Sequence, residues 1–242
     1  MKPSDIPFID SPSNPRLKEL VSLKDGKSDC FLVEGKHLVE EALSHGQVLE
    51  LFETEDFGFS FPKTTRLSER AYRKVTSLVH PEGVLAVCRK KEEEPFSSPR
   101  VLVLDGVGDP GNLGTILRTA LAFSYFDVVV LPPSTSPYSS KALMASQGAI
   151  FQLRLHFLKA EEAVVRFKES GYFLLASDLQ SSLPPEEYLG KEKLALVLGS
   201  ESHGISLYIR DHSDGRVRIE MGHIDSLNVA VAGGILMYGL RK

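Results

Sequence analysis

The sequence lacks the usual marks of membrane, secreted and metal-binding proteins. Its 242 residues contain no run of about 18 apolar residues, so we expect no membrane-spanning helix. The polar, proline-rich start lacks the apolar core of a signal peptide. The two cysteines, Cys30 and Cys88, lie in apolar segments without metal-ligand spacing, which favours a cytoplasmic protein with buried thiols. The histidines form neither an HxH nor an HExxH pattern, and we therefore expect no metal.

The sequence also lacks the excess of positive charge that nucleic-acid-binding proteins usually carry. Its net charge is −4 and its pI is near 6.0, so any RNA-binding surface must be local. Two clusters are candidates: Arg16, Lys18, Lys24 and Lys27, and further along Arg66, Arg70, Arg73 and Lys74. Judged by charge alone, a solvated helix face explains each cluster equally well.

Two α/β units are predicted, with a linker between them. Residues 1–92 contain short strand and helix patterns, and residues 93–99 form a charged, proline- and serine-containing linker. In residues 100–242, apolar strands alternate with helices; the strands are expected at 101–105, 128–131, 150–155, 172–177 and 194–199. This alternation predicts an α/β fold with a parallel sheet and helices on both faces.

The end of the chain contains an unusual apolar helix, expected from about Ser226 to Leu240 and capped by Asp225 or Ser226. Gly233 and Gly234 stand in its middle, and each costs roughly 1 kcal/mol relative to alanine. A backbone or a partner subunit must therefore approach this helix closely. A buried core helix explains the pattern; a ligand site at the helix start is the sharper alternative, since free amides lie there.

Residues 106–111 match the pattern G-x-G-x-x-G directly after a strand, which is a dinucleotide-binding signature. However, Pro110 removes an amide where that signature presents amides to a pyrophosphate. The next strand also ends without the acidic residue that binds a ribose hydroxyl. A nicotinamide-dependent oxidoreductase therefore remains the weaker interpretation.

Two charged residues at strand-to-helix junctions indicate a site. Arg118 lies among apolar residues of the helix that follows the glycine turn, six residues after Asn112. An arginine in that setting is expected to have an anionic partner, unless it simply extends to the surface. Glu201, in the glycine turn of residues 198–204, could pair with it, although an ordinary turn is the alternative.

Three stretches, in their order, resemble the three motifs of the SpoU (TrmH-type) RNA 2′-O-ribose methyltransferases of the SPOUT superfamily. They are DGVGDPGNLGTILRTALAF, LALVLGSESHGIS and IEMGHIDSLNVAVAGGILMYGL. Residues 10–90 are similar to that family's amino-terminal substrate-binding domain, which has an L30e-like fold, through SPSNPRLKELVSL, FLVEGKHLVEEAL and VHPEGVLAV. The third motif has Glu220 in place of the usual proline, and the second has Ser200 and Ser202 where Asn and Gly are frequent.

The resemblance implies a trefoil knot at the carboxyl end of the second unit and dimerisation through that unit. It implies that S-adenosylmethionine binds in the knot, with Gly199, Gly204, Ile219, Met221 and Leu227 as the cofactor-binding residues. The implied catalytic residues are Asn112, Arg118, Glu201, Ser226 and Asn228. Arg118 is the family's proposed base or base assistant, and we favour an RNA phosphate taking the proton while Arg118 steers it.

These patterns predict a cytoplasmic, S-adenosylmethionine-dependent RNA 2′-O-methyltransferase. Ribosomal RNA is expected as the substrate in preference to transfer RNA. The protein is expected to form a homodimer and to have no membrane or metal partners. Two alternatives stay open, a catalytically degenerate RNA-binding protein of the same fold and the oxidoreductase considered above.

Overall fold

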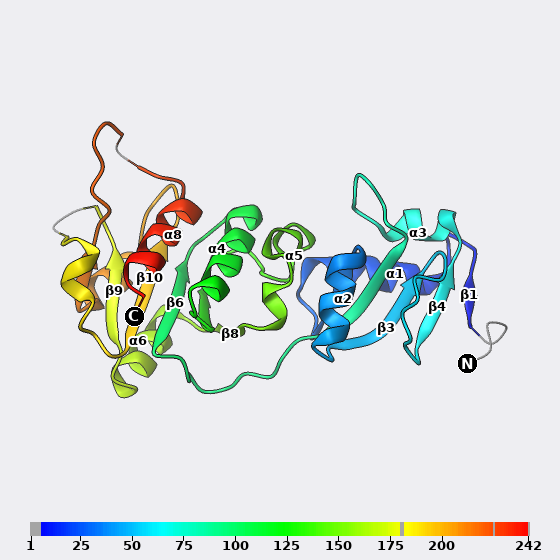
Figure 1. Ribbon diagram of the computed structural model, residues 1–242, viewed down its shortest axis with the longest axis horizontal. Helices are drawn as coiled ribbons and strands as arrows, with labels where there is room; N and C mark the ends of the chain where they lie inside the picture. The colour runs from blue at the N-terminus through cyan, green and yellow to red at the C-terminus, as the bar shows by residue number, and fades with distance from the viewer. Residues whose placement is uncertain (1–5, 180–181, 225, 242) are drawn as a thin grey trace. The chain divides into compact units, whose positions relative to one another are not determined.

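The computed structural model describes residues 6–179, 182–224 and 226–241. Contacts divide the chain into two compact units (Figure 1). Unit 1 consists of Met1–Lys90 together with Ser136–Phe151, and unit 2 consists of Lys91–Thr135 and Gln152–Lys242. The first break lies close to the linker expected from the sequence, whereas the inclusion of residues 136–151 in unit 1 was not predicted.

Unit 1 is built on a mixed five-stranded sheet in the order β1-β4-β3-β5-β2. Its strands are β1 (Phe8–Ile9), β2 (Cys30–Glu34), β3 (Val48–Glu53), β4 (Thr64–Leu67) and β5 (Val84–Arg89). Its helices are α1 (Pro15–Ser22), the 3₁₀ turn η2 (Leu23–Asp25), α2 (Lys36–Ser44) and α3 (Glu69–Val75). Strand β5 runs antiparallel to β2 and β3, while β4 runs parallel to β1 and β3.

Residues 136–151 complete the core of unit 1, although they lie far beyond Lys90 in the sequence. They form α5 (Ser140–Ser146) and the 3₁₀ turn η3 (Ala149–Phe151), and α5 packs on β2. The ring of Phe31 lies 4.8 Å from that of Tyr138 and 6.1 Å from that of Phe151. The expected strand at 150–155 is therefore wrong at its start. Ile150 and Phe151 belong to the buried turn η3, and β8 begins only at Arg154.

Unit 2 has a six-stranded, fully parallel sheet in the order β11-β9-β10-β6-β7-β8. The strands are β6 (Arg100–Asp105), β7 (Asp127–Leu131), β8 (Arg154–Phe157), β9 (Phe173–Ser177), β10 (Leu194–Gly199) and β11 (Gly215–Val217). From β6 the chain adds β7 and β8 on one side, while β10, β9 and β11 lie on the other. The switch point, where parallel α/β sheets usually bind ligands, thus lies between the carboxyl ends of β6 and β10.

Helices cover both faces of this sheet, as the sequence predicts (Figure 1). On one face, α6 (Ala160–Glu169) and α7 (Leu207–His212) share a core cluster with alternate residues of β6, β7, β9 and β10. On the other, α4 (Pro110–Ala122) packs against α8 (Val229–Gly239), and α8 contacts β10. The 3₁₀ turn η4 (Pro185–Tyr188) also contacts α8. None of the helices in the described part of the chain has the length and apolar character that a membrane crossing needs.

A buried carboxylate fixes the expected linker to unit 2. Burial would raise the pKa of Asp127, but hydrogen bonds from Arg154 and His156 and from the amides of Ser98 and Ser97 hold it well below its usual range. The segment before β6 is therefore anchored, and nearer its start Glu93 pairs with Arg166 of α6 at 2.7 Å.

The mid-helix glycines of α8 allow close packing inside unit 2. A Cβ on Gly233 would lie 2.6 Å from Cδ1 of Leu198 in β10, and a Cβ on Gly234 would lie 3.6 Å from Thr119 of α4. Intrachain packing thus explains Gly233 without a partner subunit, whereas a Cβ on Gly234 would make only an ordinary contact. This corrects one reason for expecting a dimer from the sequence.

We predict that alanine at the two glycines has different effects. Gly234→Ala should raise the free energy of unfolding by up to about 1 kcal/mol, because it gains helix propensity and meets only ordinary contact distances. Gly233→Ala must displace the buried Leu198, and overpacking costs about 1–3 kcal/mol. Urea unfolding of both variants measures the difference; equal stabilities would contradict the close packing.

Candidate active site

The turn after β6 is held by one serine of the neighbouring strand end. Oγ of Ser134 accepts hydrogen bonds from the amides of Gly106 and Val107 at 2.9 and 3.0 Å. The same hydroxyl donates to the carbonyl oxygen of Leu104 at 3.1 Å. Because the chain already uses these two amides, the turn does not offer them to a pyrophosphate. This geometry argues against the dinucleotide interpretation.

The loop after β10 folds back over a glycine. Ser200 and Gly204 exchange two backbone hydrogen bonds of 2.9 and 3.0 Å. A Cβ on Gly199 would lie 2.3 Å from the carbonyl carbon of Gly204, so no larger residue fits this backbone. Asp105, at the end of β6, accepts a hydrogen bond from the amide of Ser206 at 2.7 Å. The first and second motifs are thereby tied together.

Asn228 caps the last helix. Its Oδ1 accepts hydrogen bonds from the amides of Ala230 and Val231 at 2.9 and 3.4 Å, and α8 begins at Val229. The expected cap at Ser226 is wrong, since that residue lies in the preceding loop, and Asp225 lies outside the described residues. The helix therefore begins at Val229, later than the sequence predicts.

Three of the predicted catalytic residues, one from each motif, are joined by hydrogen bonds. Nδ2 of Asn228 donates to Oδ1 of Asn112 at 3.0 Å. Nδ2 of Asn112 in turn donates to Oε1 of Glu201 at 2.5 Å. The fold thus brings the starts of α4 and α8 and the loop after β10 to one place, from positions far apart in the sequence.

Arg118 does not join this group. Its side chain is exposed, and no hydrogen bond or ion pair links it to any other residue that the structure describes. Six residues correspond to 600° of helix rotation, so Arg118 points about a third of a turn away from Asn112. The expected pairing of Arg118 with Glu201 is therefore wrong, because Glu201 bonds to Asn112 instead.

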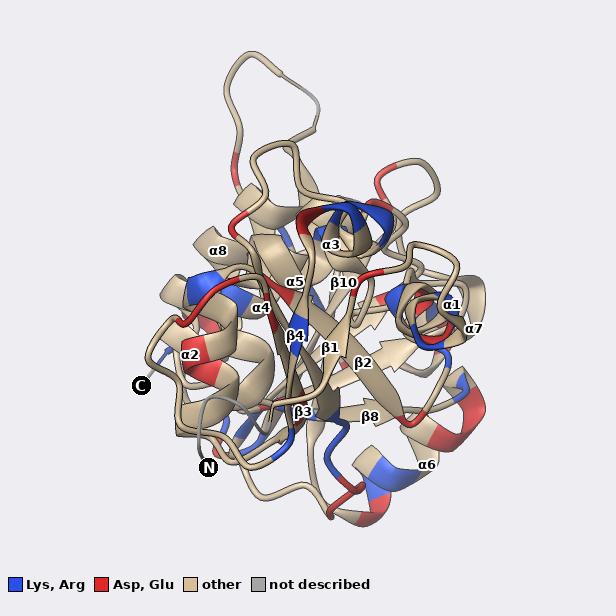
Figure 2. Cartoon of the chain, turned by 90° about the vertical axis from the view of Figure 1, so that its right-hand side faces the viewer, with Lys and Arg blue, Asp and Glu red and all other residues tan. Residues whose placement is uncertain are grey.

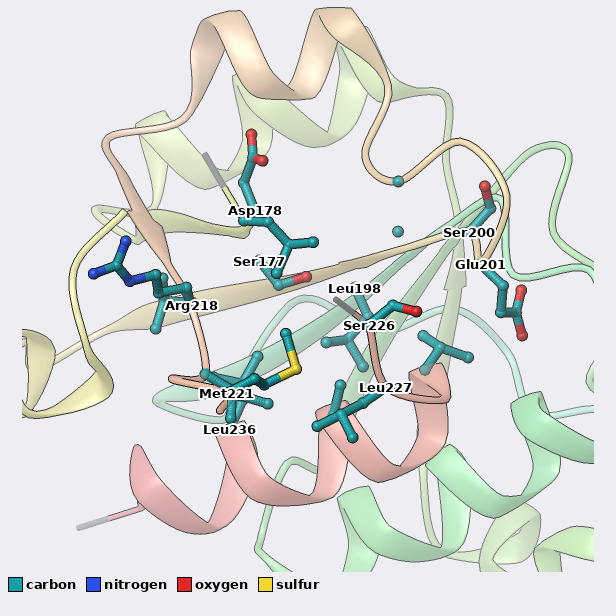
Figure 3. A pocket seen from close by; sticks show the side chains of 17 residues that line it. Ser177, Asp178, Leu198, Ser200, Glu201, Arg218, Met221, Ser226, Leu227 and Leu236 are labelled. Carbon is teal, nitrogen blue, oxygen red and sulfur yellow. The ribbon is translucent and has the colours of Figure 1, made fainter. Parts of the chain in front are cut away.

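A pocket of about 240 Å³ lies beside these residues, at the carboxyl ends of β9, β10 and β11 (Figure 3). All five residues predicted to bind the cofactor line it, together with Glu201 and Ser226. Those five are Gly199, Gly204, Ile219, Met221 and Leu227. Figure 3 shows Met221 and Leu236 at one end and Ser200 and Glu201 at the other. Asn112, Arg118 and Asn228 do not line it.

The sequence reasoning missed the wall that follows β9. Ser177, Asp178 and Leu179 line the pocket, and Oδ2 of Asp178 lies 3.1 Å from Nε of Arg210 in α7. The signal was available, because β9 is another apolar strand that ends in polar residues.

Most basic side chains of the two clusters in unit 1 face carboxylates. Arg16 pairs with Glu19 and Glu50, and the remaining pairs are Lys24–Glu34, Lys27–Asp25, Arg66–Glu53 and Arg70–Asp10. Lys18, Arg73 and Lys74 are exposed, with no ion pair to another described residue. Figure 2 accordingly shows basic and acidic residues side by side rather than one basic field.

The pocket suits a ligand with an apolar ring and positive charge. Leu198, Leu227, Leu236 and Met221 provide apolar walls for a ring system. The lining carries two acidic residues, Asp178 and Glu201, and one basic residue, Arg218. The acidic residues favour the sulfonium and ammonium groups of S-adenosylmethionine, and the basic one favours its carboxylate. A dinucleotide would need several hydrogen-bond donors for its phosphates. In the described residues, no cluster of His, Cys, Asp or Glu side chains could hold a metal ion.

Comparisons with known proteins agree with this arrangement. The chain is 35% identical over 245 residues to the 23S rRNA (guanosine(2553)-2′-O)-methyltransferase RlmP of Bacillus subtilis strain 168, covering 96% of this chain and 98% of that protein. A solved RNA 2′-O ribose methyltransferase is 29% identical with a TM-score of 0.77, covering 96% and 97% of the two chains.

An AdoMet-bound rRNA methyltransferase from Sinorhizobium meliloti has the same fold, with a TM-score of 0.86 at 24% identity over 97% of each chain. The profile of the SpoU rRNA methylase family matches residues 99–238, which include all three motifs. The chain therefore belongs to the SpoU rRNA methylase family.

Proposed function

We propose that the protein transfers a methyl group from S-adenosylmethionine to a ribose 2′-hydroxyl of RNA. The observation that carries this proposal is the pocket at the strand ends, which has the three-motif polar group of Asn112, Glu201 and Asn228 at its edge. RNA 2′-O-methylation is also the activity in the names of RlmP and of the solved ribose methyltransferase. Ribosomal RNA is the proposed substrate, because RlmP acts on 23S rRNA and matches nearly the whole chain.

The residues of the pocket bind and orient, and the cofactor supplies an activated methyl group when bound. Gly199 and Gly204 let the loop after β10 close against the ligand, while Ile219, Met221 and Leu227 cover it from the third motif. Holding the reacting atoms in line can lower the barrier by roughly 7–11 kcal/mol. Ser226 offers a hydroxyl at the pocket wall.

Arg118 is proposed to hold an RNA phosphate rather than to pair within the protein. Its guanidinium is exposed beside the motif helix and has no partner in the described chain. A planar guanidinium binds phosphate in a two-pronged manner. This proposal removes the need for a neutral arginine, whose pKa is above about 12 in water.

Three architectural features belong to the proposal as well. The carboxyl end is proposed to form the family's trefoil knot, with α8 packed between β10 and α4. Residues 1–92 are proposed as an L30e-like RNA-binding domain, in which Lys18, Arg73 and Lys74 are the cations left for phosphate contact. A homodimer is proposed through the exposed face of α8, where Val231, Ile235 and Tyr238 follow a helical spacing and are 51%, 43% and 54% exposed.

The first test is methyl transfer itself. Incubation with labelled S-adenosylmethionine should label ribosomal RNA at a ribose 2′-oxygen, as mapped by resistance of the adjacent bond to alkali, and transfer RNA should not be labelled. The cofactor should also raise the melting temperature, since it binds the native state only, and NAD should not. Gly199→Ala should abolish both effects, because its Cβ collides with the folded-back loop.

Cofactor binding without labelling of any RNA would support the degenerate RNA-binding alternative. Stabilisation by NAD would instead support the oxidoreductase. Absence of any effect of S-adenosylmethionine on melting and in calorimetry would exclude the proposed function.

The second prediction concerns Arg118. Arg118→Ala should change stability by less than about 0.5 kcal/mol, as is usual for an exposed side chain, and should bind S-adenosylmethionine normally. Its single-turnover rate should fall by about 10²-fold or more, because a misplaced RNA loses that much. Arg118→Lys keeps the charge but not the planar fork and should recover only part of the rate. Near-normal activity of Arg118→Ala would remove this residue from the mechanism.

The third prediction concerns assembly. Ile235→Glu places a charge in the middle of the exposed α8 face and should yield a folded monomer by light scattering. Val165→Glu is the matched control, because Val165 is 51% exposed on α6, on the other face of the sheet. It should leave the dimer intact. A wild-type protein that is monomeric at all concentrations would refute the interface.

A further inference from the structure

The hydrogen-bond chain at the edge of the pocket has a single polarity. It runs from the first turn of α8 through Asn228 and Asn112 to Glu201. An asparagine amide can usually be turned round, because its oxygen and nitrogen are similar in size. Here the direction follows from chemistry, since one end of the chain can only donate.

That end is the start of α8. The amides of Ala230 and Val231 are donors, so the side chain of Asn228 must present Oδ1 to them. Its Nδ2 then faces outward and donates to Oδ1 of Asn112. The amide of Asn112 is thereby fixed too, and its Nδ2 donates to Oε1 of Glu201. Each member has only one acceptable orientation.

The chain leaves one oxygen of Glu201 available. Oε1 is occupied by Asn112, whereas Oε2 has no hydrogen-bond partner within the described residues, and Glu201 lines the pocket. We propose that Oε2 of Glu201, and not the RNA phosphate favoured from the sequence, accepts the proton of the ribose hydroxyl, and that Asn228 and Asn112 are positioning residues that hold Glu201 in place. This inference rests on the proposed function.

The step balances without a further reactant. As the ribose oxygen forms its bond to the methyl carbon, the carbon–sulfur bond breaks and its electron pair stays on sulfur. The hydroxyl proton passes to Oε2 of Glu201 and then to solvent. Proton transfer by a placed side chain contributes about 10²–10⁴-fold to the rate.

Other groups at the site fit this role less well. Arg118 is a permanent donor without a free lone pair, and it points away from Asn112. Asp178, the other acidic residue on the pocket lining, lies 3.1 Å from Arg210 and is held at the end of β9. Glu201 combines a place on the lining with a side-chain hydrogen bond to Asn112 of the first motif.

Asn228→Asp tests the positioning role. Aspartate caps a helix as well as asparagine and its charge suits a helix start, so stability and S-adenosylmethionine affinity should be preserved. It cannot donate to Asn112, which must then turn and present its oxygen to Glu201. We expect kcat to fall by about ten-fold, the worth of one hydrogen bond to a charged group, with little change in the KM for RNA. Asn228→Ser, a neutral cap without that donor, is the matched control and should lose rate in the same way.

A second pair of variants distinguishes proton transfer by Glu201 from a purely structural role of that residue. Glu201→Gln should lower kcat by at least about 10²-fold while leaving the melting temperature unchanged. S-adenosylmethionine should still bind, although more weakly, because the pocket lining loses one acidic side chain. In the double variant Asn228→Asp, Glu201→Gln the three side chains can form the same hydrogen bonds in the opposite direction. Asn112 then donates to the new aspartate, and the new glutamine donates to the turned amide of Asn112. If Glu201 is the proton acceptor, the double variant stays as slow as Glu201→Gln.

Two outcomes would overturn the inference while leaving the proposed function intact. One is a double variant that regains the rate, because Glu201 would then only support its neighbours. The other is an Asn228→Asp enzyme as fast as wild type. If the wild-type protein methylates no RNA, the proposed function itself fails, and calorimetry of the cofactor with each variant shows whether the pocket is still formed.

Discussion

The close approach of α8 to β10 is the contact on which the site depends. The absence of a side chain at Gly233 lets the helix lie against Leu198, one residue before the strand ends. That approach places the cap residue Asn228 near the start of α4 and beside the loop after β10. A helix held further from the sheet would widen the pocket and separate the three motifs by more than a hydrogen bond.

The pocket and the hydrogen-bonded residues beside it have different roles in the proposed reaction. The pocket is mostly apolar, so it can exclude water from the reacting atoms, and the charged residues on its lining are Asp178, Glu201 and Arg218. Outside it, Asn112 and Asn228 are at least partly exposed. Their mutual geometry is fixed by the first turn of α8 and not by burial, and RNA bound over them would complete the enclosure.

The sequence predicted the parallel sheet and most of its strands, because apolar strands that alternate with helices are local signals. The five cofactor-binding positions followed from the family resemblance and stay a prediction, although all five line one pocket. The predictions from sequence failed where they depended on the direction in which a side chain points in the folded protein. Arg118 was expected to pair with an anion such as Glu201, but it extends to the surface, which was the stated alternative, and Glu201 bonds to Asn112 instead. For Gly233 the sequence left open a close approach within the chain or by a partner subunit, and the structure has Leu198 of β10 in that space. The placement of residues 136–151 could not be foreseen, since no local pattern shows which sheet an apolar segment will join.

That segment has a consequence for the order of folding during synthesis. Unit 1 is discontinuous: its sheet is complete at Lys90, but Tyr138, α5 and Phe151 pack on β2 and belong to the same unit. Domains generally fold as units while the chain emerges from the ribosome. This one must wait, with the face around Phe31 uncovered, until residue 151 has emerged. By then β6, α4 and β7 of the second unit have already been made, so the two units mature together and not one after the other.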